Sequence, residues 1–256
     1  MIFDTHAHYD DESFKDDVDA IFQDLKNHDV SLVLDPGCDF QSSLNSLKLS
    51  EKYDFVYTAV GLHPEEVGDS SLDELEQLFM LLGHQKCVAI GEIGLDYYWD
   101  KSQKDLQKMV FRMQMEWAAE TGKPVIIHDR EADGDCLNMI RDYPEVTGVF
   151  HCYSGSAEMA KELLNRGWYL GFDGPITYKN NKKAISVLEV CPLERILVET
   201  DSPYLSPVPM RGRRNDSRNL PYIIDKIAEV KGCSSDEIRD ITTQNGIRLF
   251  NIPVSW

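Results

Sequence analysis

Short apolar segments rich in β-branched residues recur along the chain and alternate with segments of helical periodicity. Several of them, such as Val125-Ile126-Ile127 and Ile196-Leu197-Val198, are apolar at every position, which is typical of parallel strands buried on both faces. We expect eight strands, at residues 1–5, 31–35, 55–60, 87–91, 124–127, 147–150, 169–172 and 195–199.

The segments between these strands carry helix signals. Residues 104–121 have an apolar stripe at helical spacing and are followed by Gly122 and Pro124, which end helices. Ser156 is a candidate N-cap for a helix that ends at Gly167, and Ser234 begins a capping box near the C-terminus. The stripe expected to be buried in the first of these helices is Leu106, Met109, Val110, Met113 and Trp117.

Eight strands alternating with helices predict parallel βαβ units with right-handed crossovers. At 256 residues, the expected fold class is α/β, a (β/α)8 TIM barrel that forms a single domain over residues 1–256. An open doubly wound sheet is the alternative, but no glycine-rich phosphate turn follows the first strand. Residues 202–218 are rich in Pro, Arg and Gly and are expected to form a loop after strand eight.

The composition narrows the possible partners. The net charge of −18 argues against a long duplex-DNA footprint, which needs a basic face, but leaves contact with a strand end open. No apolar run approaches the roughly 20 residues that span a bilayer, and no signal peptide is visible. The six cysteines are scattered without a C-x-x-C pair, which favours reduced thiols. We expect a cytoplasmic, monomeric protein without a membrane partner.

Histidines and carboxylates follow the predicted strands. In a (β/α)8 barrel the C-terminal strand ends form the active-site face. A single histidine at such a position is usually structural, whereas seven suitable side chains at one end predict a metal site. Imidazole and carboxylate ligands suit Zn, Mn, Fe or Ni, and six strong ligands exceed one tetrahedral zinc site, which favours two metals. The seven residues are His6, His8, His63, Glu92, His128, His151 and Asp201.

The chain resembles the TatD-type deoxyribonucleases of the amidohydrolase superfamily, nearly from end to end. The motifs that carry the resemblance are Phe3-Asp4-Thr5-His6-Ala7-His8, Gly61-Leu62-His63-Pro64, Gly91-Glu92-Ile93-Gly94-Leu95-Asp96-Tyr97, Ile127-His128, His151-Cys152-Tyr153-Ser154-Gly155, Glu199-Thr200-Asp201-Ser202-Pro203-Tyr204, Arg211-Gly212-Arg213-Arg214-Asn215 and Thr242-Thr243-Gln244-Asn245 with Arg248-Leu249-Phe250.

The resemblance implies a centre of two divalent metal ions, whether Zn, Mn or Mg. His6, His8 and Asp201 would hold one metal, His128 and His151 the second, and Glu92 would bridge the two. Asp201 would also act as the base toward the attacking water. His63 would contact the substrate phosphate or the leaving group. The implied activity is 3′-to-5′ exonuclease action on DNA, especially on single strands or strand ends.

Further residues on the predicted loops are candidates for binding this substrate. Arg130, Arg211 and Arg214 could bind phosphate oxygens, or they could only neutralise nearby carboxylates. Tyr97 and its neighbours could stack on a terminal base, or they could pack the loop. Tyr153 could hydrogen-bond substrate, although a tight Ser-Gly turn explains that segment nearly as well.

Two positions depart from the family pattern. Asp129 stands where relatives often carry Ser or Thr, and Ser217 stands where Pro is common.

A second hypothesis for the function is C–N or ester hydrolysis, such as D-aminoacyl-tRNA deacylation, but many enzymes of that kind carry a bridging lysine where this chain has Glu92. A third is a non-catalytic metal-binding scaffold, which an intact ligand set including Asp201 disfavours.

Overall fold

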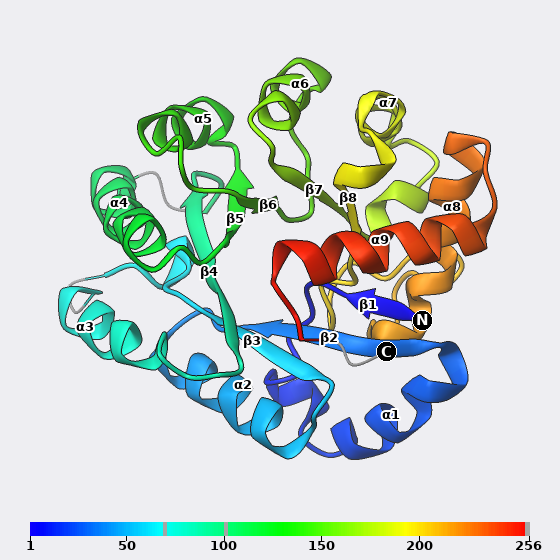
Figure 1. The fold of residues 1–256 in the computed structure, drawn as a ribbon, viewed down its shortest axis with the longest axis horizontal. Coiled ribbons are helices and arrows are strands. Elements are labelled where there is room, and N and C mark those ends of the chain that lie inside the picture. The colour runs from blue at the N-terminus through cyan, green and yellow to red at the C-terminus, as the bar shows by residue number, and fades with distance from the viewer. Residues whose placement is uncertain (69–70, 100–101, 254–256) are drawn as a thin grey trace. The chain divides into compact units, whose positions relative to one another are not determined.

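The computed structural model describes residues 1–68, 71–99 and 102–253 (Figure 1). The chain forms two compact units. The first contains Met1–Asp35 and Cys152–Trp256, and the second contains Pro36–His151. The expectation of a single domain over residues 1–256 stays a prediction.

Within the described ranges the predicted strands are all present, and they follow one another in the sheet in the order β1 to β8. The strand pairs inside each unit are parallel. Strands in this order with helices between them are those of a (β/α)8 TIM barrel, which confirms the predicted fold class. The strands are β1 (Ile2–Asp4), β2 (Val30–Pro36), β3 (Val56–Val60), β4 (Cys87–Asp96), β5 (Val125–Arg130), β6 (Gly148–Phe150), β7 (Tyr169–Phe172) and β8 (Ile196–Val198).

The α-helices begin and end close to their sequence signals. The helix predicted over residues 104–121 has those bounds and ends at Gly122, whose φ of 69° suits a left-handed cap. Ser156 and Ser234 cap their helices through their side-chain oxygens, as predicted. The helices are α1 (Val18–Asp24), α2 (Phe40–Lys52), α3 (Ser71–Leu81), α4 (Lys104–Thr121), α5 (Asp133–Asp142), α6 (Ala157–Asn165), α7 (Lys182–Val190), α8 (Leu220–Lys231) and α9 (Ser235–Leu249).

In the first unit, the chain after β8 lies beside β1. The Thr5 amide donates to the Val198 carbonyl at 3.2 Å, and Ala7 forms a parallel bridge with Ser202. Helix α9 packs on both strands, where the Phe3 and Phe250 rings meet edge to face with centroids 6.1 Å apart. The C-terminal ends of β1 and β8 are therefore held together.

In the second unit, β4 extends five residues beyond its predicted end at residue 91. It stays paired with β5 as far as Asp96, which lies opposite Arg130. Gly94 permits this, because its φ is +143° and a Cβ there would lie 2.0 Å from the His128 carbonyl oxygen. Glycine weakens most strands, so the sequence pattern placed the end of the strand too early.

The buried face of α4 differs from the predicted apolar stripe. Met109 is 42% exposed, whereas Gln107 and Gln114 are buried. Gln114 accepts from the Leu62 amide at 2.7 Å and donates to the Leu62 carbonyl at 3.1 Å. Gln107 likewise accepts from the Asp96 amide at 3.1 Å and donates to the Asp96 carbonyl at 3.0 Å. These buried glutamines satisfy backbone groups of Leu62, which follows β3, and of Asp96, the last residue of β4.

Replacing Gln114 with leucine should lower the free energy of unfolding by about 2–4 kcal/mol, because two buried backbone groups of Leu62 lose their partners. Urea denaturation would measure the change. The matched control is Gln77→Leu, at an exposed position on α3 in the same unit. A change below about 0.5 kcal/mol, the size usual at exposed positions, would show that Leu62 finds other partners.

No helix in the described part of the chain is long and apolar enough to cross a membrane. All six cysteines are free, as expected; Cys87, Cys136 and Cys191 are buried, and the other three are partly exposed. Burial raises the pKa of the Cys87 thiol to about 11, so this thiol stays protonated at neutral pH.

Candidate functional site

The first unit brings together His6, His8 and Asp201. The two histidines follow β1, and Asp201 follows β8. The Nε2 atoms of His6 and His8 lie 3.1 Å apart, and Asp201 Oδ1 lies 3.6 Å from the first and 3.5 Å from the second. Two imidazoles and a carboxylate this close together, within 4.8 Å of one another, can hold a divalent transition metal. We call them the first ligand group.

Asp4 supports the first ligand group through hydrogen bonds to the segments that carry it, a role that the sequence did not predict. Its side chain is buried, and it accepts hydrogen bonds from the Thr200 hydroxyl at 2.7 Å and the Ser217 hydroxyl at 2.6 Å. It also accepts from the backbone amides of Thr200 and His6. Burial outweighs these bonds and raises the pKa of Asp4 to about 7. Asp4 thus fixes the segments on which His6 and Asp201 sit.

Ser217 explains one departure from the family pattern. Besides its bond to Asp4, its hydroxyl lies 2.7 Å from the Tyr9 hydroxyl, and its amide donates to the same oxygen at 2.9 Å. A proline at this position would lack both the amide donor and the hydroxyl. Ser217 therefore ties the end of the loop after β8 to the segment that follows β1.

The second unit brings together His63, Glu92, His128 and His151. Glu92 is buried on β4. Its Oε1 lies 2.6 Å from His151 Nε2, 2.9 Å from His128 Nδ1 and 3.5 Å from His63 Nε2. We call Glu92, His128 and His151 the second ligand group, with His63 beside it. That one metal centre contains both groups, with Glu92 as the bridge, stays a prediction from the resemblance.

Asp96 orients His128, and the sequence assigned it no role. Its Oδ2 lies 3.0 Å from His128 Nε2, and its Oδ1 accepts from the Tyr98 amide at 2.8 Å. Burial alone would lower the pKa of His128, but the hydrogen bonds to Asp96 and Glu92 raise it to about 9. The same contact brings the pKa of Asp96 down to about 2, against the effect of burial. A carboxylate on one imidazole nitrogen leaves the other directed at Glu92, the usual arrangement behind a metal-binding histidine.

Replacing Asp96 with asparagine should weaken metal binding at the second ligand group roughly 10- to 100-fold, the loss typical of such supporting carboxylates. Competition with a chromogenic zinc chelator would measure the affinity. Asp73→Asn, on the exposed face of α3, is the matched control. If both variants bind zinc as the wild type does, Asp96 has no influence on the ligands.

Two of the predicted substrate-binding tyrosines are buried. The Tyr97 hydroxyl donates to Asp135 at 2.8 Å, and the Lys104 ammonium lies 4.0 Å from the centre of its ring. The Tyr153 hydroxyl donates to the Ser156 carbonyl at 2.8 Å. Tyr97 therefore makes packing contacts, and the Tyr153 hydroxyl is bonded within the turn segment that follows His151; these are the alternatives that the sequence left open.

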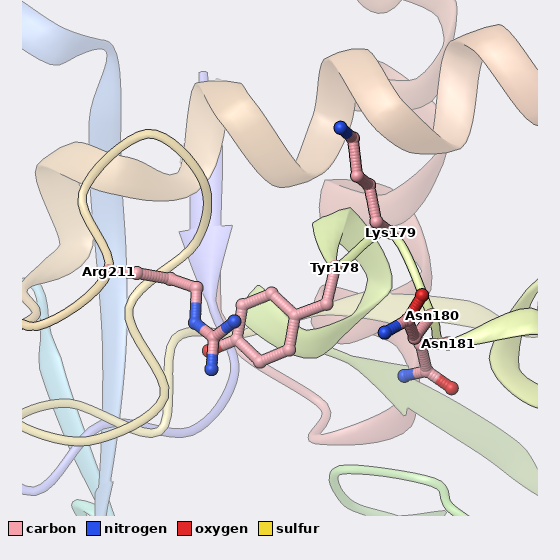
Figure 2. A pocket seen from close by; sticks show the side chains of 5 residues that line it. All are labelled: Tyr178, Lys179, Asn180, Asn181 and Arg211. Carbon is pink, nitrogen blue, oxygen red and sulfur yellow. The ribbon is translucent and has the colours of Figure 1, made fainter.

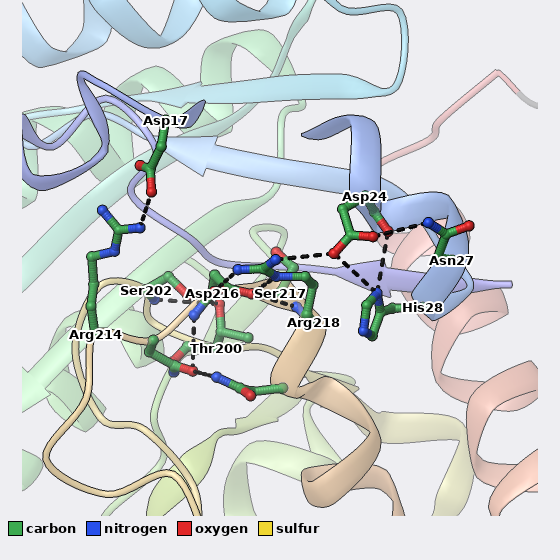
Figure 3. Close-up of polar contacts among 12 residues, drawn as sticks. Asp17, Asp24, Asn27, His28, Thr200, Ser202, Arg214, Asp216, Ser217 and Arg218 are labelled. Atoms are coloured by element: carbon green, nitrogen blue, oxygen red, sulfur yellow. Dashed lines mark hydrogen bonds and ion pairs between the residues drawn. The ribbon is translucent and has the colours of Figure 1, made fainter. Parts of the chain in front are cut away.

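The predicted substrate-binding arginines have different surroundings. Arg214 forms an ion pair with Asp17 at 2.5 Å (Figure 3) and also donates to the Ser13 carbonyl. Arg130 lies over the Tyr98 ring, 3.9 Å from its centre, and Arg211 lies 4.2 Å from the centre of the Tyr178 ring. Carboxylate neutralisation thus describes Arg214, whereas the other two stack on aromatic rings.

Comparison with known proteins identifies the family. The family described as TatD related DNase matches residues 3–251. The chain belongs to the TatD family. It is 42% identical over 254 residues to the uncharacterized metal-dependent hydrolase YabD of Bacillus subtilis, covering 98% of this chain and 100% of that protein. It is 35% identical over 260 residues to the uncharacterized metal-dependent hydrolase YcfH of Escherichia coli, covering 100% and 97%.

A solved structure agrees with this family. The crystal structure of YjjV, a TatD homologue from Escherichia coli, matches with a TM-score of 0.93 at 30% identity and covers 98% of each chain. The fold and the family together place the chain among the TatD-type metal-dependent hydrolases.

Proposed function

We propose that the chain is a metal-dependent phosphodiesterase that removes nucleotides from the 3′ ends of DNA, preferring single strands. The observation that carries the proposal is the presence of two ligand groups, His6 with His8 and Asp201, and Glu92 with His128 and His151. Each combines imidazole with carboxylate at metal-ligand spacing. Each would hold one divalent cation, whether Zn, Mn or Mg. When bound, such cations lower the pKa of a coordinated water and neutralise phosphate charge.

Asp201 would take the proton of the attacking water on its carboxylate. This carboxylate lies beside two imidazoles of the first ligand group, and Asp4 holds the backbone around it through Thr200. A base positioned in this way contributes to the rate because it needs no reorganisation when the proton moves.

His63 would donate a hydrogen bond to a phosphate oxygen. The Glu65 amide donates to His63 Nδ1 at 3.2 Å, so in the neutral ring the proton is on Nε2. Burial and the neighbouring His128 lower the pKa of His63, which favours the neutral ring. The Nε2–H, which faces Glu92 Oε1 at 3.5 Å in this structure, would turn from that oxygen to the leaving group or the phosphate.

DNA is the favoured substrate because the matching family is described as a DNase and because Glu92 stands where many amidohydrolases that act on C–N bonds carry a lysine. The net charge of −18 favours contact with a strand end over a long duplex footprint. Ester or amide hydrolysis is the outcome that would replace this proposal.

The test uses single-stranded 20-nucleotide DNA labelled at its 3′ or 5′ end, incubated with enzyme loaded with Mg, Mn or Zn. We expect the 5′ label to give a descending ladder and the 3′ label to appear at once as mononucleotide. Removal of the metal with EDTA should abolish cleavage of both labelled strands. A 3′-terminal phosphorothioate should block cleavage only if digestion starts at that end. Intact DNA together with metal-dependent turnover of D-aminoacyl-tRNA would overturn the proposal in favour of deacylation.

A further inference from the structure

The loops after β7 and β8 form a pocket in the first unit that contains no member of either ligand group. Its volume is about 440 Å³, and its lining residues are Tyr178, Lys179, Asn180, Asn181 and Arg211 (Figure 2). Loops after strands seven and eight form phosphate sites in many (β/α)8 barrels, so the chemistry of this lining is informative.

Two of the lining residues form the wall of the pocket. The Tyr178 hydroxyl donates to the Ser206 carbonyl at 2.9 Å. Asn181 accepts from the Ala184 amide at 3.2 Å and donates to the Pro175 carbonyl at 3.1 Å. Their polar atoms are thus engaged within the protein, and the donors available to a ligand come from Lys179, Asn180 and Arg211.

The Arg211 guanidinium is held in place before any ligand arrives. It lies over the face of the Tyr178 ring, with its central carbon 4.2 Å from the ring centre. Cation–π stacking of this kind orients the planar fork and reduces the side-chain entropy lost on binding. The donors that line the pocket are therefore an oriented guanidinium from Arg211, the ammonium of Lys179 and the amide of Asn180.

The local charge contrasts with the acidity of the chain. Arginines elsewhere, such as Arg214 and Arg218, form ion pairs with aspartates (Figure 3). Within the described residues, neither of the two cations that line the pocket, Lys179 and Arg211, forms an ion pair with a carboxylate. Two lining cations without a carboxylate partner, on a chain of net charge −18, mark a place where a bound anion would be stabilised.

We propose that this pocket binds a backbone phosphate of single-stranded DNA other than the phosphate that is cleaved. The inference rests on the proposed nuclease function and deepens it. Arg211 and Lys179 would bind the phosphate oxygens through charge-assisted hydrogen bonds, and the exposed side of the Tyr178 wall would contact the adjoining nucleotide. The pocket accordingly makes the enzyme favour strands over dinucleotides, whose single phosphate must occupy the reaction site.

The experiment compares kcat/KM for a 12-nucleotide strand with kcat/KM for a dinucleotide, using metal-loaded full-length protein. In Lys179→Ala/Arg211→Ala the ratio of the two should fall about tenfold or more, as expected for lost bonds to a charged group. The slope of log(kcat/KM) for the strand against log[salt] should also flatten by about 0.7 for one lost phosphate contact. The matched control is Lys161→Ala/Arg166→Ala, which removes the same charges from α6 and its C-cap in the same unit.

An unchanged ratio, or the same fall in the control, would overturn the pocket proposal. If the double variant does not fold, the single variant Lys179→Ala, at an exposed position, replaces it. In this variant the ratio of the two kcat/KM values should fall about threefold. Wild-type protein that cleaves DNA, combined with an unchanged ratio in the variants, would refute only the pocket. Wild-type protein that cleaves no DNA would refute the proposed function and the proposed ligand together.

Discussion

Asp201→Asn should lower kcat for single-stranded DNA at least about a thousandfold, within the range that a positioned general base contributes. Asparagine keeps a side-chain oxygen near the two imidazoles, which lie 3.6 and 3.5 Å from Asp201 Oδ1. It has no negative charge and cannot take a proton at neutral pH. We therefore expect a large fall in kcat with a small change in KM, because the lost interaction belongs to the transition state.

Metal content and a control variant separate this effect from loss of the site. Asp225→Asn, at an exposed position on α8 in the same unit, should keep full activity. Elemental analysis should show how much metal Asp201→Asn retains, and kcat is compared at saturating metal. A kcat within tenfold of the wild type at equal metal content would remove Asp201 from the role of base.

The ligand groups could be predicted from the sequence because their placement follows from strand geometry. His6 and His8 are two residues apart, next to a strand, and residues two apart in a strand share a face. Asp201 joins them because β8 lies beside β1, which the eight-strand barrel prediction already implied.

The residues that hold these ligands could not be predicted, because their partners are far away along the chain. Asp4 binds Ser217, which is 213 positions away, and Gln114 binds Leu62, 52 positions away. Helical periodicity assigns a polar residue to the exposed face of a helix. Gln107 and Gln114 break that pattern because backbone groups of the strand-end loops need buried partners.

The surroundings of the candidate substrate-binding residues could be predicted less well than those of the candidate metal ligands, for a related reason. A tyrosine or arginine near a strand end has a long side chain that can turn toward solvent or toward the protein. Tyr97 turns to Asp135, and Arg214 turns to Asp17. Arg211 instead lies over Tyr178, a residue that no motif singled out. The choice depends on neighbours from other loops, and sequence spacing carries no information about them.

His6→Ala/His8→Ala should remove one metal ion per chain and lower kcat/KM for DNA at least about a thousandfold, because several kcal/mol of charge stabilisation are lost with the ion. Only Asp201 would remain of the first ligand group, and a single carboxylate does not retain a transition metal in competition with water. The second group keeps its contacts, since Glu92 lies 2.9 Å from His128 and 2.6 Å from His151. Elemental analysis after dialysis should therefore give one metal ion per chain instead of two.

The chain provides a matched control for this double variant. His28 and His84 lie outside both ligand groups, and each is near a carboxylate, Asp24 and Glu51 respectively. His28→Ala/His84→Ala removes the same number of imidazoles and should keep both metals and full activity. The reciprocal variant, His128→Ala/His151→Ala, should lose the other metal. An unchanged metal count in His6→Ala/His8→Ala would exclude these histidines as ligands. Loss of both metals would mean that the second group cannot bind alone, because its affinity then depends on the cation held by the first.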